Sequence, residues 1–313
     1  MHYIHNLDPF IFRITETFGL RWYGFSYLLG FIVGYFLYRC LVRKGFSDMN
    51  EKLAGDYIFT GALFGVIVGG RLGYMLFYSL GNFIANPLSF FYFHEGGMSA
   101  HGGIVGFMIF TWWFCRRHRL SWLNAMDNLA VVAPPGIFFG RLANFINGEL
   151  YGRISNVPWA VKFPSELHSM SPHVQQEIVN ALVAKNPAWD SVYVIHEAVQ
   201  YSPELRTALA EHLAPRHPSQ IYEALGEGAL LFAVLWILRT RFRLHDGVLS
   251  GVFLMGYAVI RSACEFFREP DSPLVGLFTR GQFLSLFLFL AGVVFLVVAR
   301  YSTAQGTKET QKT

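Results

Sequence analysis

Long apolar runs separated by short polar segments dominate this chain. A helix that crosses the hydrocarbon core of a bilayer needs about 20 mostly apolar residues. Runs of this kind cover approximately residues 22–41, 57–78, 96–115, 128–148, 219–238, 247–267 and 281–299. The pattern therefore predicts an all-α polytopic membrane protein with seven transmembrane helices.

The composition agrees with a membrane protein and excludes several other classes. Hydrophobic residues make up 53% of the 313 positions and charged residues only 15%, whereas a soluble domain carries about 25% charged residues. A net charge of +4 is too small and too scattered to indicate nucleic-acid binding. Cys40, Cys115 and Cys264 lie in or beside apolar runs at wide spacing, which predicts packing residues rather than a disulfide framework or a metal cluster.

The distribution of Lys and Arg between alternate sides predicts the orientation. One side collects Arg39, Arg43, Lys44, Lys52, Arg116, Arg117, Arg119, Arg239, Arg241, Arg243, Arg300, Lys308 and Lys312. The other side holds only Arg13, Arg21, Arg268 and Arg280. By the positive-inside rule, we expect the N-terminus outside and the C-terminus inside.

This orientation predicts a domain organisation with an external head. Residues 1–148 carry spans one to four, 149–218 form the head between spans four and five, 219–299 carry spans five to seven, and 300–313 form a cytoplasmic tail. The head is expected to be ordered, because Ser171-Pro172 and Ser202-Pro203 are pairs that typically open a helix.

Several charged or polar residues interrupt the apolar runs. A charge at the bilayer centre costs roughly 2.5 to 3.5 kcal/mol on insertion scales, so such residues usually face a cavity, a partner or a substrate. These residues are Arg71, His101, Arg141 with Asn144 and Asn147, and Tyr257 and Arg261 with Glu265. Arg141 and Asn144 share one helix face, as do Tyr257, Arg261 and Glu265.

Two interpretations of the arginines remain open at this point. An internal ion pair between Arg261 and Glu265 could simply hold the helices together. Three intramembrane arginines with few obvious acidic partners favour an anion instead, because a guanidinium binds phosphate oxygens bidentately. In a bilayer, that anion is a phospholipid headgroup.

Glycines and prolines in the spans suggest both packing and function. Two glycines follow His101 and would leave backbone space for something to approach the ring. Pro134-Pro135 interrupts the fourth span and frees backbone carbonyls that only protein or a wet cavity could satisfy, which favours a cavity just before Arg141. Close helix packing explains a further group of glycines at intervals of four residues, namely Gly65, Gly69 and Gly73, and Gly136 and Gly140.

Three other polar residues have structural explanations. Tyr23 lies at the outer end of the first span, where aromatic belts are expected. Ser219 suits a helix cap at the start of the fifth span. Glu223 lies one turn further on, and the helix dipole sufficiently explains an acidic residue there.

Motifs along almost the whole chain resemble the prolipoprotein diacylglyceryl transferases of bacterial inner membranes. The matching stretches are Trp22-Tyr23-Gly24, Gly69 to Tyr74, Gly97-Met98-Ser99 with His101-Gly102-Gly103, Gly140 to Glu149, Arg216-His217-Pro218-Ser219-Gln220, and Gly256-Tyr257 through Arg261 to Arg268. The set is specific as a whole, although each stretch alone would be weak.

The resemblance implies an enzyme that moves the diacylglyceryl group of phosphatidylglycerol onto the lipobox cysteine of a prolipoprotein signal peptide. It implies catalytic roles for Tyr23, His101, Arg141, Tyr257 and Arg261. It implies phosphatidylglycerol contacts for Arg141, Asn144, Glu149, Gly152, Arg261 and Glu265. We expect no cofactor, no metal and no nucleic-acid partner, and a location in the bacterial inner membrane.

The chemistry assigns different roles to these residues. The arginines would hold the phosphate as negative charge grows on it. The thiol needs a base or a positive field to become a thiolate, so His101 is either that base or a group that orients the headgroup.

Two other classes of protein remain as alternatives. A lipid transporter would use the arginines to line an anion pathway, but seven unequal spans and a head do not divide into inverted repeats. A membrane scaffold would leave His101 and the arginines without a purpose.

Overall fold

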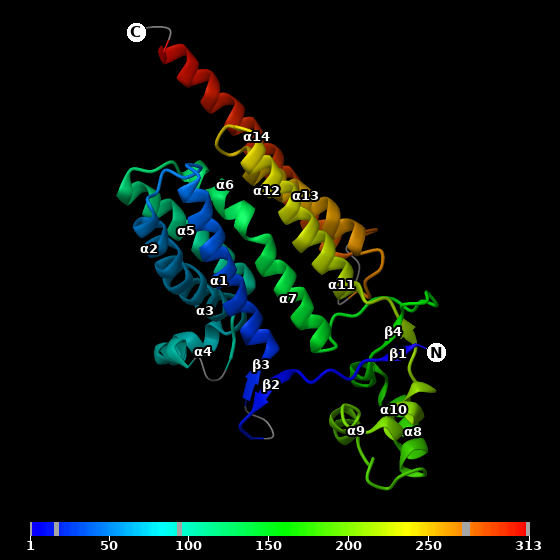
Figure 1. Ribbon diagram of the computed structural model, residues 1–313. Helices are drawn as coiled ribbons and strands as arrows, with labels where there is room; N and C mark the ends of the chain where they lie inside the picture. The colour runs from blue at the N-terminus through cyan, green and yellow to red at the C-terminus, as the bar shows by residue number, and fades with distance from the viewer. Residues whose placement is uncertain (1, 16–18, 93–95, 271–275, 311–313) are drawn as a thin grey trace. The chain divides into compact units, whose positions relative to one another are not determined.

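The computed structural model describes residues 2–15, 19–92, 96–270 and 276–310 and is mostly helical (Figure 1). The strands are β1 (Tyr3–Ile4), β2 (Phe10–Arg13), β3 (Gly19–Arg21), β4 (Val161–Lys162) and β5 (Pro215–Arg216). The α-helices are α1 (Trp22–Arg43), α2 (Glu51–Thr60), α3 (Val68–Tyr78), α4 (Leu80–Ala85), α5 (Ala100–His118), α6 (Trp122–Val132), α7 (Pro134–Ile146), α8 (Pro172–Val183), α9 (Val192–Ala198), α10 (Pro203–Ala210), α11 (Ser219–Glu223), α12 (Leu231–Arg241), α13 (Val248–Cys264) and α14 (Arg280–Thr310). Shorter segments are the π-helices η1 (Gly61–Ile67) and η5 (Ala224–Leu230) and the 3-10 helices η2 (Pro87–Phe91) and η4 (Pro164–Ser169).

Five helical segments in the described part of the chain are long and apolar enough to cross a membrane. They are Trp22–Arg43, Glu51–Tyr78, Trp122–Ile146, Ser219–Arg241 and Arg280–Arg300. The other two predicted spans overlap α5 and α13, which have 19 and 17 residues. A polytopic helical membrane protein is therefore confirmed, and the count of seven spans stays a prediction.

The predicted break in the fourth span is confirmed. Helix α6 ends at Val132 and α7 begins at Pro134. Proline is tolerated in the first turn of a helix but lacks the N–H that would continue the preceding one. The two helices therefore share one span without an unbroken ladder of hydrogen bonds.

The chain forms two compact units that interleave along the sequence. The first unit contains Met1–Gly30, Pro134–Ala233 and Leu254–Leu290, and the second contains Phe31–Ala133, Val234–Phe253 and Ala291–Thr313. Both predicted membrane segments, 1–148 and 219–299, therefore contribute residues to each unit.

In the second unit, glycines allow α5 to pack closely against η1 and α3. A Cβ atom on Gly69 would lie 2.7 Å from the carbonyl oxygen of Gly102, and one on Gly73 would lie 2.7 Å from Gly102 Cα. A Cβ atom on Gly65 would come within 2.8 Å of Phe107 Cα. The predicted packing role is confirmed for these three glycines, since any side chain there would push the helices apart. It is wrong for Gly140, where a Cβ atom would meet nothing within 4 Å.

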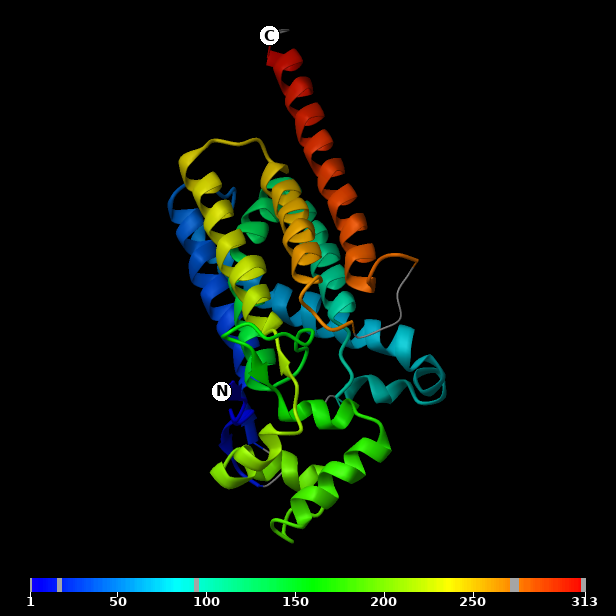
Figure 2. The same cartoon turned by 90° about the vertical axis from the view of Figure 1, so that its right-hand side faces the viewer.

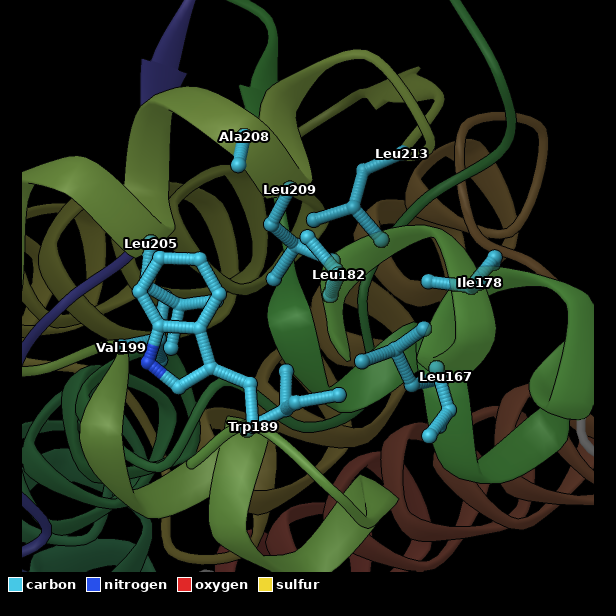
Figure 3. Close-up of a cluster of buried hydrophobic side chains, with 11 residues drawn as sticks. Leu167, Ile178, Leu182, Trp189, Val199, Leu205, Ala208, Leu209 and Leu213 are labelled. Carbon is cyan, nitrogen blue, oxygen red and sulfur yellow. The ribbon is translucent and has the colours of Figure 1, made fainter. Parts of the chain in front are cut away.

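The first unit holds a small helical core within the predicted head. Helices α8, α9 and α10 cluster together in Figures 1 and 2, and Ser171 and Ser202 are their N-caps at α8 and α10, each followed by proline. Figure 3 shows the apolar side chains that meet between them, among them Leu182, Trp189 and Leu209. The head is thus ordered, as the two Ser-Pro pairs predict.

A three-stranded sheet ties the N-terminus to this head. Strand β1 pairs parallel with β4, and β4 pairs antiparallel with β5. The ring of His5, which follows β1, lies 5.4 Å from the ring of Phe145 and 5.5 Å from that of Phe163, measured between centroids. Burial lowers the pKa of His5 to about 4.

We predict that acid weakens this attachment. Because the folded pKa of His5 lies below its unfolded value of about 6.5, its contribution is complete above pH ~6.5 and falls by up to about 3 kcal/mol as the pH drops toward 4. The His5 N–H donates to the Lys162 carbonyl at 2.9 Å, so hydrogen exchange at this amide measures the change. In a His5→Phe variant the excess loss of protection at acid pH should disappear; an unchanged loss would assign it to other groups.

Candidate functional site

Glu223, the last residue of α11, lies at the centre of a buried cluster of charged side chains. Its side chain is fully buried, and its carboxylate meets three guanidinium groups. Glu223 Oε2 lies 3.0 Å from Arg141 Nη1. Glu223 Oε1 accepts hydrogen bonds from Arg261 Nη1 and, at 3.1 Å, from Arg268 Nη1. The helix dipole alone is therefore the wrong explanation for Glu223.

Two more carboxylates complete this cluster. Glu227 in η5 is also fully buried, and its Oε2 atom accepts hydrogen bonds from Arg141 Nε at 3.1 Å and Arg141 Nη2 at 3.0 Å. Glu265, just past α13, accepts a hydrogen bond from Arg261 Nη2. Three arginines and three glutamates thus form one group, which we call the ion cluster, with a formal charge of zero.

The ion cluster corrects one step of the sequence analysis. The premise that the intramembrane arginines have few acidic partners is wrong for Arg141 and Arg261, and the alternative ion pair between Arg261 and Glu265 is present. Glu227 was missed altogether. Its signal was available, because Glu223 and Glu227 are four residues apart in one apolar run and so share a helix face.

Glycines on both sides of Glu227 allow the two arginine-bearing helices to approach it. A Cβ atom on Gly228 would lie 2.5 Å from Phe138 Cβ on α7, and one on Gly226 would lie 2.6 Å from Ile260 Cγ2 on α13. The segment is π-helical from Ala224 to Leu230, a rare geometry that is frequent at functional sites. The two glycines and the π-helical segment thus place Glu227 between Arg141 and Arg261.

Both arginines keep donors that the carboxylates do not use. A guanidinium has five N–H groups. Arg141 donates two hydrogen bonds to Glu227, from Nε and Nη2, and its Nη1 atom forms an ion pair with Glu223. The side chains of Arg141 and Arg261 are 17% and 13% exposed, whereas Glu223 is fully buried. The two arginines are therefore more accessible than the Glu223 carboxylate that they share.

Two further predicted site residues share the helices of the cluster. Asn144 is buried on α7, three residues after Arg141. Tyr257 is half-buried on α13, one turn before Arg261. Both therefore lie in the same helix stripes as the arginines, as their spacing predicts.

Glu149 and Gly152 follow α7 at a chain junction. Glu149 is exposed; its side chain accepts a hydrogen bond from Asn147 Nδ2 at 3.2 Å, and its carbonyl accepts one from Gln220 Nε2 at 2.7 Å. The Gly152 N–H donates to the His217 carbonyl at 2.9 Å, and a Cβ atom there would lie 2.4 Å from the Phe267 carbonyl oxygen. Close backbone approach thus requires glycine at position 152.

The connection into the fifth span is fixed by polar contacts rather than by a serine cap. The Ser219 hydroxyl donates to the Leu150 carbonyl at 3.0 Å, so the predicted capping role is wrong. Arg216 contacts Glu166 Oε1 at 2.5 Å and Glu269 Oε2 at 3.1 Å. Burial lowers the pKa of His217, which favours its neutral form.

Tyr23 and His101 are both exposed residues in the first turn of a helix. Tyr23 opens α1 in the first unit, and its hydroxyl lies 3.2 Å from the Tyr27 hydroxyl. His101 belongs to the second unit, at the start of α5. Gly102 packs against Gly69 and Gly73 of the neighbouring helix. The backbone space that was expected beside His101 for a ligand is therefore filled at Gly102 by helix packing.

Arg71 has a structural role, because it binds a neighbouring stretch of backbone. It is 2% exposed, and its guanidinium donates hydrogen bonds to backbone carbonyls over the segment that follows α4. The acceptors are Ser89, Phe90, Tyr92, Gly96 and Gly97. Five backbone carbonyls thus accept hydrogen bonds from this buried guanidinium.

Several apolar helices and a buried cluster of arginines and carboxylates define this chain as a polytopic membrane protein with an internal charged site. The family model for prolipoprotein diacylglyceryl transferase matches residues 9–298. The chain therefore belongs to the prolipoprotein diacylglyceryl transferase family.

Curated relatives share this family over nearly their whole length. Phosphatidylglycerol–prolipoprotein diacylglyceryl transferases from Bdellovibrio bacteriovorus and Stenotrophomonas maltophilia are each 38% identical, over 94% and 96% of this chain and 93% and 94% of theirs. The enzyme of the same name from Neisseria gonorrhoeae is 40% identical over 94% of this chain and 96% of its own.

We predict that Glu223→Gln destabilises the protein more than any other single carboxylate-to-amide change in the ion cluster. Three arginines lose their shared countercharge, and breaking a buried ion pair costs about 3 to 5 kcal/mol. Thermal unfolding of the purified protein in one detergent measures the loss. Glu227→Gln and Glu265→Gln are measured beside it, and a loss in either that equals the loss in Glu223→Gln would contradict the prediction. Glu51→Gln, at a side chain 41% exposed, is the control, because surface pairs contribute only about 0 to 1 kcal/mol.

Proposed function

We propose that this protein transfers the diacylglyceryl group of phosphatidylglycerol to the lipobox cysteine thiol of prolipoproteins, the first step of bacterial lipoprotein maturation. The reaction forms a thioether and releases glycerol phosphate. Membership of the family and the activity named for its relatives support it. The structural observation that carries it is a largely buried pair of arginines, Arg141 and Arg261, whose side chains remain 17% and 13% exposed.

The proposed step is a displacement at the glycerol carbon that bears the phosphate ester. The thiolate sulfur forms a bond to that carbon, the carbon–oxygen bond breaks, and its electron pair leaves on the phosphate oxygen. Arg141 and Arg261 would stabilise this charge, and losing one such donor in a comparable site costs on the order of 3 kcal/mol. The cluster carboxylates hold both guanidinium groups in place before substrate arrives, so little reorganisation is needed.

The other predicted residues take supporting roles in this proposal. His101 takes the thiol proton or orients the headgroup. Asn144, Tyr257 and Tyr23 contribute hydrogen bonds to the substrate. Glu149 and Gly152 shape the segment next to α7, and Glu265 orients Arg261. No cofactor or metal is required for this displacement.

The membrane arrangement follows the charge pattern of the sequence. We propose seven spans in the bacterial inner membrane, with α5 and α13 added to the five long helices. The N-terminus and the head, residues 149–218, would be periplasmic, and residues 300–313 cytoplasmic. A membrane protein whose substrates are a phospholipid and a signal peptide would then reach both from within the bilayer.

We predict that Arg141→Lys loses at least about 100-fold in transferase rate, because lysine keeps the charge but cannot bind both a carboxylate edge and a phosphate in fixed geometry. Purified protein is reconstituted with phosphatidylglycerol and a lipobox peptide, and mass spectrometry detects the diacylglyceryl adduct on cysteine. Arg39→Lys, at an arginine paired with Glu51, is the matched control and should retain its rate. A wild-type protein that is folded but forms no adduct would refute the proposed function.

We predict that protease added to intact spheroplasts cuts between residues 165 and 215. A tag on the C-terminal tail should stay protected until the membrane is permeabilised. The size of the fragments on an immunoblot reports both sites. Cleavage of the tail with protection of the head would invert the proposed orientation.

A further inference from the structure

We propose that Glu227 is a positioning residue that acts on the substrate phosphate through Arg141. Its carboxylate fixes the plane of the Arg141 guanidinium, so that the N–H groups that do not bind Glu227 are presented in one orientation. This inference rests on the proposed function and adds to it a residue that touches no substrate.

The contact between the two side chains is suited to this role. Arg141 Nε and Nη2 both donate to Glu227 Oε2, at 3.1 Å and 3.0 Å. Arginine is a long side chain with about 2 kcal/mol of rotamer entropy. Two hydrogen bonds along one edge stop rotation of the guanidinium plane, which a single charge at a distance would not do. The Arg141 side chain therefore loses its rotamer entropy before the phosphate binds, and not during binding.

The backbone around Glu227 is built to hold it between two helices. Gly226 and Gly228 bring α13 and α7 into contact on either side, and the side chain of Glu227 is fully buried. Because a side chain at either glycine would separate the helices, the close approach fixes the position of the carboxylate. A fixed carboxylate in turn gives Arg141 a fixed partner.

Glu223 and Glu227 contact different numbers of arginines in the ion cluster. Glu223 contacts Arg141, Arg261 and Arg268, so its removal leaves several arginines uncompensated and lowers stability. Glu227 makes both of its hydrogen bonds to Arg141, with Arg261 Nη1 at 3.6 Å. The effect of losing Glu227 should therefore depend on Arg141.

A double-mutant cycle in the reconstituted assay tests this dependence. Glu227→Gln preserves size but loses the charge and weakens the hold on Arg141. We expect it to lower kcat roughly 10- to 100-fold in the wild-type background, the order of loss caused by misplacing a catalytic group, with a smaller change in KM. In the Arg141→Lys background, the same change should cost less than about 2-fold, because there is no longer a guanidinium edge to fix.

A second variant tests whether the position of the Glu227 carboxylate matters or only its charge. Normalising rates to the amount of folded protein controls for loss of folding. Glu227→Asp keeps the negative charge but is one methylene shorter, so we expect it to resemble Glu227→Gln in kcat. Rates are expressed per folded protein, as measured by size-exclusion chromatography. If Glu227→Asp restores the wild-type rate, charge rather than position is what matters, and the inference is wrong.

The matched control is Glu166→Gln, at another buried carboxylate that pairs with an arginine, Arg216, at 2.5 Å. Whatever this variant costs, the factor should be the same in the wild-type and Arg141→Lys backgrounds. An equal factor for Glu227→Gln in both backgrounds would overturn the positioning role while leaving the transferase function intact. Absence of adduct from the wild-type protein would overturn both.

Discussion

The burial of charge in a medium of low dielectric constant is the constraint on which the rest of this structure depends. An isolated buried charge costs several kcal/mol, and only close pairing with good geometry offsets it. The ion cluster meets this condition with three arginines and three glutamates drawn from α7, from α11 and η5, and from the end of α13. Segments far apart in the sequence are therefore held together by one electrostatic requirement.

This requirement explains the small residues that surround the cluster. Hydrogen-bonded ion pairs need about 3 Å between heavy atoms, so the helices that carry them must come closer than large side chains allow. Gly226 and Gly228 permit this approach beside Glu227. Glycines also allow α5 to pack closely against Gly65, Gly69 and Gly73 in the second unit, where the contact involves no charged side chains. Sequence patterns of small residues thus mark close helix contacts of two different kinds.

The sequence predicts the apolar membrane helices, the break at Pro134 and the helices within residues 149–218, because each depends on a local pattern: apolar length, a missing N–H and a Ser-Pro start. It also singles out Arg141 and Arg261, since a charge in an apolar run is conspicuous. It fails for Arg71 and for the partners of the two arginines. Five backbone carbonyls from a distant loop satisfy Arg71, and Glu223 and Glu227 meet Arg141 across about 80 positions of chain, which no local periodicity encodes.

The neutrality of the ion cluster also limits how it can bind an anion. A phosphodiester brings one negative charge to a group of formal charge zero, so the favourable contacts must come from geometry rather than from net charge. Within the cluster, the side chain of Glu223 is fully buried, whereas those of Arg141 and Arg261 are 17% and 13% exposed. The arginines are therefore the more accessible members of these ion pairs. The proposed function assigns them the contact with the substrate phosphate, with the buried glutamates holding them from the protein side.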